Sequence, residues 1–299
     1  MSQQINPGDS NKITRDYFDS LLIEFRHIDS IIPDTGISLF GKKFDTPVTT
    51  AALSHLERCH PEGLTEMARG AKAANAVAFV GMGDEDELDR ITATGAKSIK
   101  IIKQYADNDV IFKKIKHAEK CGCLAVGMDF DHAFTRMGKH DEIHGLKMAG
   151  KSLDELKSFV AATTLPFVIK GVLSTQDALK CIEAGVQGIV VSHHAGIMSY
   201  AVPPLMILPE IVEAVGKKMK IFVDCGIESG MDAFKALALG ADAVSVGRPL
   251  MEPLKEKGAE GVKDAILKYT AELAGVMAFT CSHTVTNIDP KILRSKISI

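Results

Sequence analysis

The residue types best suited to proton transfer stand directly after short apolar runs in this sequence. Lys170 ends the run Phe167-Val168-Ile169, and His193 and His194 follow Val190-Val191-Ser192. A lysine in an apolar wall is partly desolvated, which suits it to Schiff-base chemistry or to stabilising an anion, although its ammonium could also simply reach solvent. A histidine titrates near neutral pH and is a natural general base. We therefore expect one imidazole to point into a site and the other to be structural.

Two later segments combine glycine with a single arginine. Asp224-Cys225-Gly226 and Gly247-Arg248-Pro249 both follow apolar runs. Backbone N–H groups of glycine loops, with an adjacent helix N-terminus and an arginine, form a phosphate site. The alternative is that these glycines only make tight turns.

The elements that position these residues recur as an apolar run followed by a helical segment. Eight runs predict strands, at 47–52, 76–80, 98–102, 124–128, 167–170, 188–192, 221–224 and 243–247. The segments between them have helical periodicity, at 63–74, 85–94, 110–121, 153–162, 176–184, 207–215, 231–239 and 262–276. Eight strands that alternate with helices predict a closed parallel sheet. We expect an α/β fold, a (β/α)₈ TIM barrel over about residues 45–280, in a single domain spanning 1–299.

In such a barrel the carboxyl ends of all strands surround one opening. The residues expected there include many titratable groups: Ser54, His55, Gly81, Gly83, Lys103, Gln104, Asp129, Asp131, Lys170, His193, His194, Asp224, Gly226, Gly247 and Arg248. The sequence therefore predicts an active site at this end.

Two stretches interrupt the alternation. Residues 1–45 contain one predicted helix, about Ile13 to Phe25, as a short N-terminal extension that covers an end of the barrel. Residues 130–151 form a long polar connection, which indicates a substrate loop or, alternatively, a disordered connector.

Composition excludes several classes of partner. The net charge is only −3 and the basic residues are scattered, so we expect neither nucleic acid nor an anionic membrane as a partner. The N-terminus has no signal-peptide core and no apolar run is long enough to span a bilayer, so we expect a cytoplasmic protein. The six cysteines form no C-x-x-C pair and indicate reduced thiols.

Residues 166–249 resemble the FMN-dependent α-hydroxy acid oxidase and dehydrogenase family, which includes glycolate and lactate oxidases. The resemblance rests on PFVIKGVLSTQDA, GVQGIVVSHHAG, LPEIVEAVG, DCGIESGMDAFKALALGA and VGRP. It is weaker over residues 41–131, where GKKFDTPVTTAA and KHAEKCG are similar to the family.

The resemblance implies an oxidoreductase with FMN as cofactor, a small-molecule substrate and a homo-oligomeric assembly such as a tetramer. Lys170 would stabilise the reduced flavin, and His194 would be the active-site base. The other implied cofactor contacts are Ala51, Ala52, Ser192, Asp224, Gly226, Gly247 and Arg248.

The sequence departs from the family where the substrate binds. Ile197 stands in place of the arginine that clamps the substrate carboxylate, and Glu228 in place of an arginine near the phosphate. Lys103 falls near the active-site tyrosine, which makes it a catalytic candidate, and Ile101 occupies about the place of a glutamine. We therefore expect altered substrate specificity, with substrate contacts from three candidates: His193, Arg136 and Asp129.

Three other functions are open at this stage. An FMN enzyme of this architecture could act as an isomerase without net redox change. A metal-dependent lyase or hydrolase could use a group formed by Asp129, Asp131, His132, His140, His144, His193 and His194. A phosphate-ligand binding protein without activity is the third. The spacing matches no known metal motif, and the same holds for His55, Cys59 and His60, so we expect no resident metal.

Overall fold

A computed structural model describes residues 6–296 and confirms the predicted barrel. The eight barrel strands are β4 (Val48–Thr50), β5 (Ala78–Val80), β6 (Ser98–Lys103), β7 (Ala125–Asp129), β10 (Phe167–Val172), β11 (Gly188–Val191), β12 (Lys220–Val223) and β13 (Ala243–Val246). They form one sheet in the order β4-β13-β12-β11-β10-β7-β6-β5, in which every ladder is parallel. Thr50 closes the circle, because its N–H donates to the Val77 carbonyl at 3.2 Å and its hydroxyl donates to the Phe79 carbonyl at 3.2 Å.

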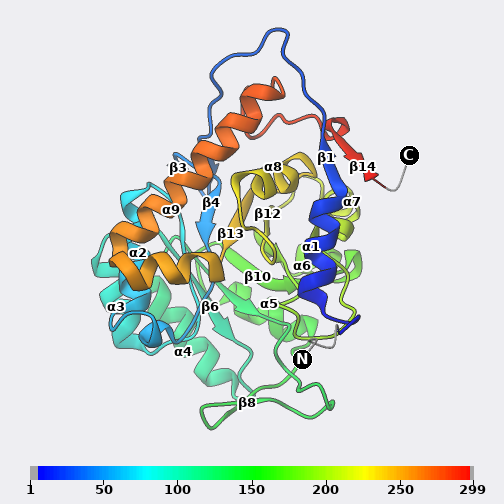
Figure 1. Cartoon of the computed structure of the whole chain (residues 1–299). Coiled ribbons are helices and arrows are strands. Elements are labelled where there is room, and N and C mark those ends of the chain that lie inside the picture. The colour runs from blue at the N-terminus through cyan, green and yellow to red at the C-terminus, as the bar shows by residue number, and fades with distance from the viewer. Residues whose placement is uncertain (1–5, 297–299) are drawn as a thin grey trace, which may run out of the picture.

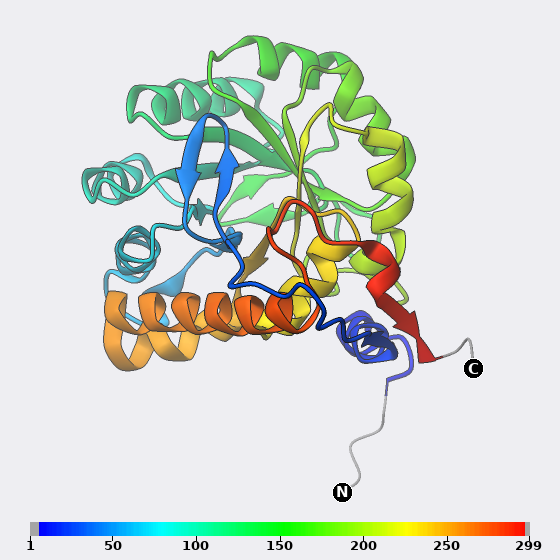
Figure 2. The same cartoon turned by 90° about the horizontal axis from the view of Figure 1, so that it is seen from above.

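Helices surround the strands, as Figures 1 and 2 show. They are α2 (Gly63–Ala73), α3 (Glu85–Ala93), α4 (Asn108–Lys120), α5 (Leu153–Ala161), α6 (Thr175–Glu183), α7 (Pro204–Val215), α8 (Gly230–Ala238) and α9 (Met251–Phe279). All eight predicted helices are present. The last begins earlier than predicted, because the chain re-enters a helix across a kink at Gly258.

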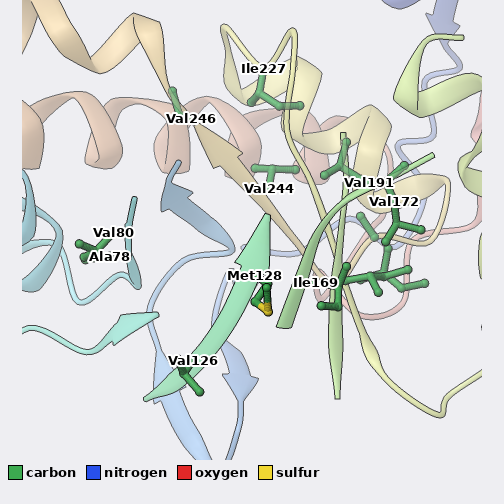
Figure 3. Packing of buried hydrophobic residues seen from close by; sticks show 14 of the residues in the cluster. Ala78, Val80, Val126, Met128, Ile169, Val172, Val191, Ile227, Val244 and Val246 are labelled. Atoms are coloured by element: carbon green, nitrogen blue, oxygen red, sulfur yellow. The ribbon is translucent and has the colours of Figure 1, made fainter. Parts of the chain in front are cut away.

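Strand residues alternate between two apolar layers because successive side chains point to opposite faces. Val126, Ile169 and Val244 belong to the layer that the helices cover, shown in Figure 3. Phe222 belongs to the second layer, where its ring lies 5.1 Å from that of Phe79.

The hairpin of β2 (Ile37–Leu39) and β3 (Lys42–Phe44) closes one end of the barrel. Its turn residue Phe40 lies 6.3 Å, ring to ring, from Phe222. The hairpin was not predicted, since its strands are short and its apolar residues few.

The N-terminal helix is shorter and earlier than predicted. Helix α1 runs from Ser10 to Ser20, and Asp9 caps it by accepting a hydrogen bond from the Asn11 N–H. The expected helix 13–25 is wrong at its C-terminal end, because β1 (Leu21–Ile23) pairs there with β14 (Leu293–Ser295) in an antiparallel ladder. The first two turns of α1 reach the carboxyl ends of β11 to β13, as the contacts below show.

The long connection 130–151 is not a structureless connector. It contains the short hairpin of β8 (Glu142–Ile143) and β9 (Leu146–Lys147), and an isolated bridge joins Phe134 to His140. A second bridge joins Met148 to Tyr105, beyond the end of β6. This loop is therefore anchored beside the predicted opening.

The turn after β12 requires glycine at position 226. Gly226 has φ +94°, and a Cβ there would lie 2.9 Å from the Phe18 ring and 3.0 Å from Thr14. We expect Gly226→Ala to lower the free energy of unfolding by about 2–4 kcal/mol, since backbone strain and displacement of α1 add. Gly122→Ala is the matched control, because Gly122 has φ +71° and open space, and it should cost only about 1–2 kcal/mol. Urea denaturation measures the free energy of unfolding of both variants. Equal losses would show that the contact between position 226 and α1 does not contribute to stability.

Candidate active site

A cavity of about 470 Å³ opens at the carboxyl ends of the barrel strands. Its wall comes from five strand ends, with Asn11 added from α1. The lining residues are Asn11, Ala51, Ala52, Leu53, Lys170, His194, Ala195, Asp224, Cys225, Gly226, Ile227, Glu228, Ser245, Gly247, Arg248 and Pro249. The structure thus brings together eight of the predicted residues: Ala51, Ala52, Lys170, His194, Asp224, Gly226, Gly247 and Arg248.

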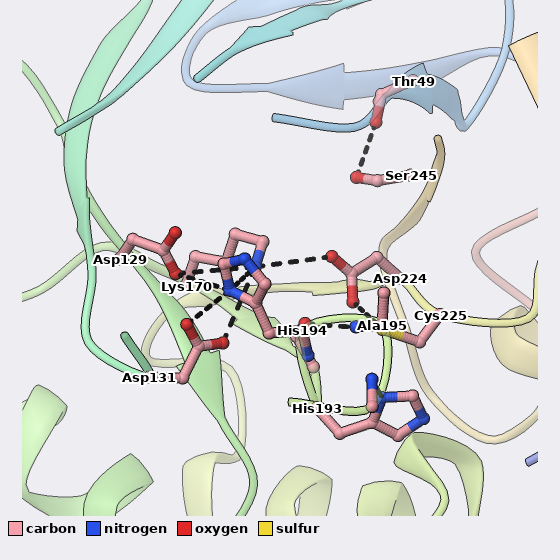
Figure 4. A network of polar contacts seen from close by, with 12 residues as sticks. Thr49, Asp129, Asp131, Lys170, His193, His194, Ala195, Asp224, Cys225 and Ser245 are labelled. Atoms are coloured by element: carbon pink, nitrogen blue, oxygen red, sulfur yellow. Dashed lines mark hydrogen bonds and ion pairs between the residues drawn. The ribbon is translucent and has the colours of Figure 1, made fainter. Parts of the chain in front are cut away.

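Lys170 lies among three carboxylates at the inner end of this cavity (Figure 4). Its Nζ is 3.5 Å from Asp129 Oδ1, 3.6 Å from Asp131 Oδ2 and 3.9 Å from Asp224 Oδ2. Burial alone would lower the pKa of Lys170, but the three aspartates raise it well above its ordinary value. The ammonium form is therefore retained, which argues against the Schiff-base role because that chemistry needs a neutral amine.

Among residues 6–296, His194 finds side-chain partners at one ring nitrogen, Nδ1. Its Nδ1 lies 2.6 Å from Asp131 Oδ1 and 3.4 Å from Asp129 Oδ1. Burial and the ammonium of Lys170, 3.2 Å from Nδ1, disfavour the imidazolium, but the hydrogen bonds with the two aspartates prevail and raise the pKa of His194 to about 9. Because Nδ1 is occupied, Nε2 is the nitrogen that can exchange a proton with a ligand.

The two aspartates titrate in opposite directions. Burial raises the pKa of Asp131 to about 6, although Lys170 opposes the shift. Burial also disfavours the charged form of Asp129, but Lys170, His194 and Lys103 together hold its pKa well below the usual range. Asp129 is therefore the permanent anion of the pair. The sequence placed Asp131 at the opening and in the alternative metal-binding group, but its contact with His194 was missed.

Lys103 is tied to this cluster and does not line the cavity. Its Nζ lies 2.6 Å from Asp129 Oδ2, and its side chain is only 11% exposed. The structure therefore places Lys103 and Asp129 behind Lys170 and His194. There the Asp129 carboxylate contacts both of these residues, and Lys103 partly neutralises that carboxylate.

His193 points away from the cavity. Its Nε2 lies 2.7 Å from the Thr14 hydroxyl of α1, and its Nδ1 accepts a hydrogen bond from the Gly196 N–H at 3.0 Å. It is the structural member of the histidine pair. Ser192 lies next to it and fixes the same turn, because its hydroxyl accepts a hydrogen bond from the His194 N–H at 3.1 Å.

The opposite end of the cavity suits an anion. Gly226, Gly247 and Arg248 line it, as predicted. Arg248 Nη2 donates to Asn11 Oδ1 at 2.9 Å, and Asn11 Nδ2 donates to the Ala195 carbonyl at 2.8 Å. Asn11 was missed, since no local sequence signal connects a helix near the N-terminus with residues about 185 to 240 positions later.

Arg15 provides a second tie between α1 and this end of the cavity. Its guanidinium forms a two-pronged pair with Asp232 at 2.9 and 3.1 Å and donates to the Gly226 carbonyl at 3.2 Å. The Asp232 carboxylate in turn accepts a hydrogen bond from the Glu228 N–H. The turn that carries Gly226 and Glu228 is therefore held from outside the barrel.

Arg136, a predicted substrate contact, does not line the cavity and is bound to the main chain. Its Nε donates to the Ile197 carbonyl at 2.9 Å and its Nη2 to the Gly196 carbonyl at 3.1 Å. The long connection is thereby joined to the turn after β11. One edge of the guanidinium is thereby occupied, and Nη1 has no hydrogen-bond partner within the described part of the chain.

The metal-binding group of the alternative hypothesis comes together only in part. Asp129, Asp131 and His194 are close enough to share an ion, but the Lys170 ammonium already contacts all three. His144 instead contacts His55, and His140 stacks on Phe134. This arrangement gives the lyase or hydrolase alternative no support.

Comparisons with known proteins identify the family. The sequence profile described as FMN-dependent dehydrogenase matches residues 3–152 and 147–295. The chain belongs to this family. It is 29% identical to a peroxisomal (S)-2-hydroxyacid oxidase of Arabidopsis thaliana, over 88% of this chain and 82% of the relative. It is 30% identical to an L-lactate oxidase of Roseobacter sp. (strain GAI101), over 87% of this chain and 79% of the relative.

Solved structures agree with the sequence comparison. A mandelate oxidase variant with the monooxide FMN adduct superposes with a TM-score of 0.87 at 29% identity, covering 99% of this chain and 94% of that one. Mandelate oxidase with (S)-2-phenylpropionate gives 0.86 at 28% identity, with 97% and 90% covered. The predicted family, TIM-barrel fold and FMN cofactor are confirmed.

The cavity of this FMN-dependent dehydrogenase fits its cofactor. Arg248 and the glycine turns at one end provide donors for a phosphate. Ala51, Ala52 and Leu53 form an apolar side suited to a planar ring, and the buried ammonium of Lys170 at the other end suits a ring that gains negative charge.

Arg248 is the residue whose loss tests the phosphate end. We expect Arg248→Ala to weaken FMN binding by about tenfold to a hundredfold, because one charge-assisted contact to a phosphate is removed. Fluorescence titration of the apoprotein with FMN measures the change. Arg90→Ala, on the outer helix α3, is the control. Unchanged affinity in Arg248→Ala would remove this residue from the phosphate site.

Proposed function

We propose that this chain oxidises a hydroxy compound, a hydroxy acid or a related alcohol, with FMN as the acceptor and with a substrate preference unlike that of its named relatives. The observation that carries the proposal is the pairing of His194 Nδ1 with Asp131 beside the Lys170 ammonium. This arrangement provides a base and a fixed cation at the inner end of a cofactor-sized cavity.

The proton follows a short path in this proposal. Neutral His194 accepts the proton of the substrate hydroxyl at Nε2, and Asp131 stabilises the imidazolium that forms. Bound FMN would supply the redox chemistry, as the acceptor of a hydride equivalent. Two electrons and one proton leave the carbon as hydride and one proton leaves the hydroxyl, so the substrate becomes a carbonyl compound.

Lys170 acts as a fixed charge and not as an acid. Its ammonium is held in place by Asp129, Asp131 and Asp224, so it can offset negative charge that develops on the flavin ring without reorganising. Lys103 is a positioning residue in this scheme, because it neutralises Asp129 from behind.

The substrate end is where this chain differs from the family. Ile197 offers no charge to a carboxylate, and Arg136 uses one edge of its guanidinium on the Gly196 and Ile197 carbonyls. We propose that Arg136 Nη1 is the remaining cationic contact for a substrate and that carboxylate recognition is weakened accordingly.

His194→Ala tests the proposed base. We expect anaerobic flavin bleaching by substrate to slow by about a hundredfold to ten-thousandfold while FMN stays bound. In the wild type the rate should rise with pH up to about 9, because the raised pKa of His194 means that its basic form accumulates only as pH approaches that value. Stopped-flow absorbance between pH 6 and 10 measures both effects, with 2-hydroxy acids and the corresponding amides and esters as substrates.

The control for this experiment is Thr14→Val, which removes the partner of the structural histidine and leaves His194 unchanged. Normal bleaching in His194→Ala would exclude it as the base. Turnover of a substrate with no electron acceptor and no bleaching would favour the isomerase alternative.

Ile197→Arg tests the altered specificity. We expect the ratio of flavin-reduction rates for mandelate over mandelamide to increase by about tenfold to a hundredfold, because an arginine restores a two-pronged contact to the carboxylate alone. Ile197→Met is the control, because methionine is unbranched like arginine but uncharged. It should leave the ratio near the wild-type value. An unchanged ratio in Ile197→Arg would show that position 197 does not face the substrate.

The expectations for cellular location, oligomeric state and domain assignment concern properties that a single chain does not reveal. No helix among residues 6–296 is long and apolar enough to cross a membrane. The cytoplasmic location, the homo-oligomeric or tetrameric state and the single-domain assignment of residues 1–299 stay predictions.

A further inference from the structure

A second cluster of metal-binding side chains lies on the outside of the barrel, between α3 and α4. His117 and Cys121 are four residues apart on α4 and therefore share one face of that helix. Asp89 approaches them from α3. The Cys121 Sγ lies 3.0 Å from Asp89 Oδ1 and 3.3 Å from His117 Nε2, and His117 Nε2 lies 3.1 Å from the same Asp89 oxygen.

The three donor atoms converge on one point. In a nucleophilic relay the histidine would use its two nitrogens, one toward the thiol and one toward the carboxylate. Here both Cys121 and Asp89 contact His117 Nε2, so the imidazole cannot pass a proton between them. The geometry is that of ligands around a common centre.

We propose that Asp89, His117 and Cys121 bind one zinc ion, with water as the fourth ligand. Thiolate, imidazole and carboxylate are the three protein ligands that Zn²⁺ accepts in tetrahedral sites. An ideal tetrahedral zinc site separates such donor atoms by about 3.4 to 3.6 Å. The pairs described here need to move apart by only a few tenths of an ångström, and the Asp89 side chain, 58% exposed, is free to do so.

Charge and access favour entry of the ion. Asp89 brings a carboxylate, and zinc binding converts the Cys121 thiol into a thiolate with release of one proton to solvent. Without metal, the Glu85 carbonyl lies 3.2 Å from His117 Nε2 and competes for that nitrogen. Because Glu85 and Asp89 both belong to α3, a bound ion would replace hydrogen bonds between α3 and α4 with coordination bonds between the same two helices.

The proposed zinc site is independent of flavin chemistry. Its ligands lie on the helices that follow β5 and β6, and none of them lines the cavity with Lys170 and His194. We therefore expect zinc to stabilise the fold without being required for flavin reduction.

The experiment uses the chelator-treated, FMN-bound protein. Calorimetric titration with Zn²⁺ should give one ion per chain, and saturating zinc should raise the melting temperature, because a ligand of the folded state stabilises it by mass action. Cys121→Ser and Asp89→Asn should each weaken zinc binding by at least about tenfold and lose the thermal shift. Cys281→Ser, which removes a thiol bonded to the Ile28 carbonyl, is the matched control and should behave as the wild type.

Titration with Cd²⁺ gives a direct readout of the ligand. A thiolate-to-cadmium charge-transfer band in the ultraviolet should appear in the wild type and in Cys281→Ser and be missing from Cys121→Ser. Absence of stoichiometric zinc binding overturns the proposal. Binding that Cys121→Ser keeps and His194→Ala loses also overturns it, since the ion would then lie at the Asp129, Asp131 and His194 group.

Discussion

The ammonium of Lys170 among three carboxylates is the interaction on which the site depends. A buried lysine without partners would lose its proton, and buried aspartates without a cation would gain one. Two distant segments supply the carboxylates: Asp129 ends β7 and Asp131 follows it by two residues, whereas Asp224 comes directly after β12. Only a closed parallel barrel brings these positions around one lysine, so the charge state of the site and the closure of the fold are coupled.

The same cluster determines what His194 can do. The aspartates that keep Lys170 charged also raise the pKa of His194, so the residue that should accept a proton is held in its protonated form at neutral pH. Lys170 limits this effect, because its ammonium lies near His194 Nδ1 and opposes a second positive charge. The orientation of the imidazole and its basicity are therefore set by one group of charges, and a change in either aspartate alters both.

How much of the fold and of the site could be predicted depends on how far apart in sequence the interacting residues lie. The alternation of apolar runs with helical segments is local, so the barrel and its eight strands could be inferred from sequence, and with them the placement of Lys170, His194 and Arg248 around one cavity. The contacts of α1 could not, because Asn11 and Thr14 reach residues almost 180 or more positions away through side chains with no local signature. For the same reason the sequence indicated that one of the two adjacent histidines faces the cavity but not how the other is held: Thr14 and the Gly196 N–H bind His193.

The two ends of the cavity are built differently, and this difference bears on specificity. The cofactor end is formed by strand ends and glycine turns that α1 braces through Asn11 and Arg15, so its geometry is fixed by the barrel. The proposed substrate contacts lie on two loops, the turn after β11 and the connection 130–151, which meet through Arg136 and main-chain carbonyls. A main-chain carbonyl accepts a hydrogen bond from an arginine whatever the side chain of its residue is. The contact with Arg136 is therefore compatible with isoleucine at position 197. A change of substrate is thus possible at the loops without altering the charges that hold Lys170 and His194.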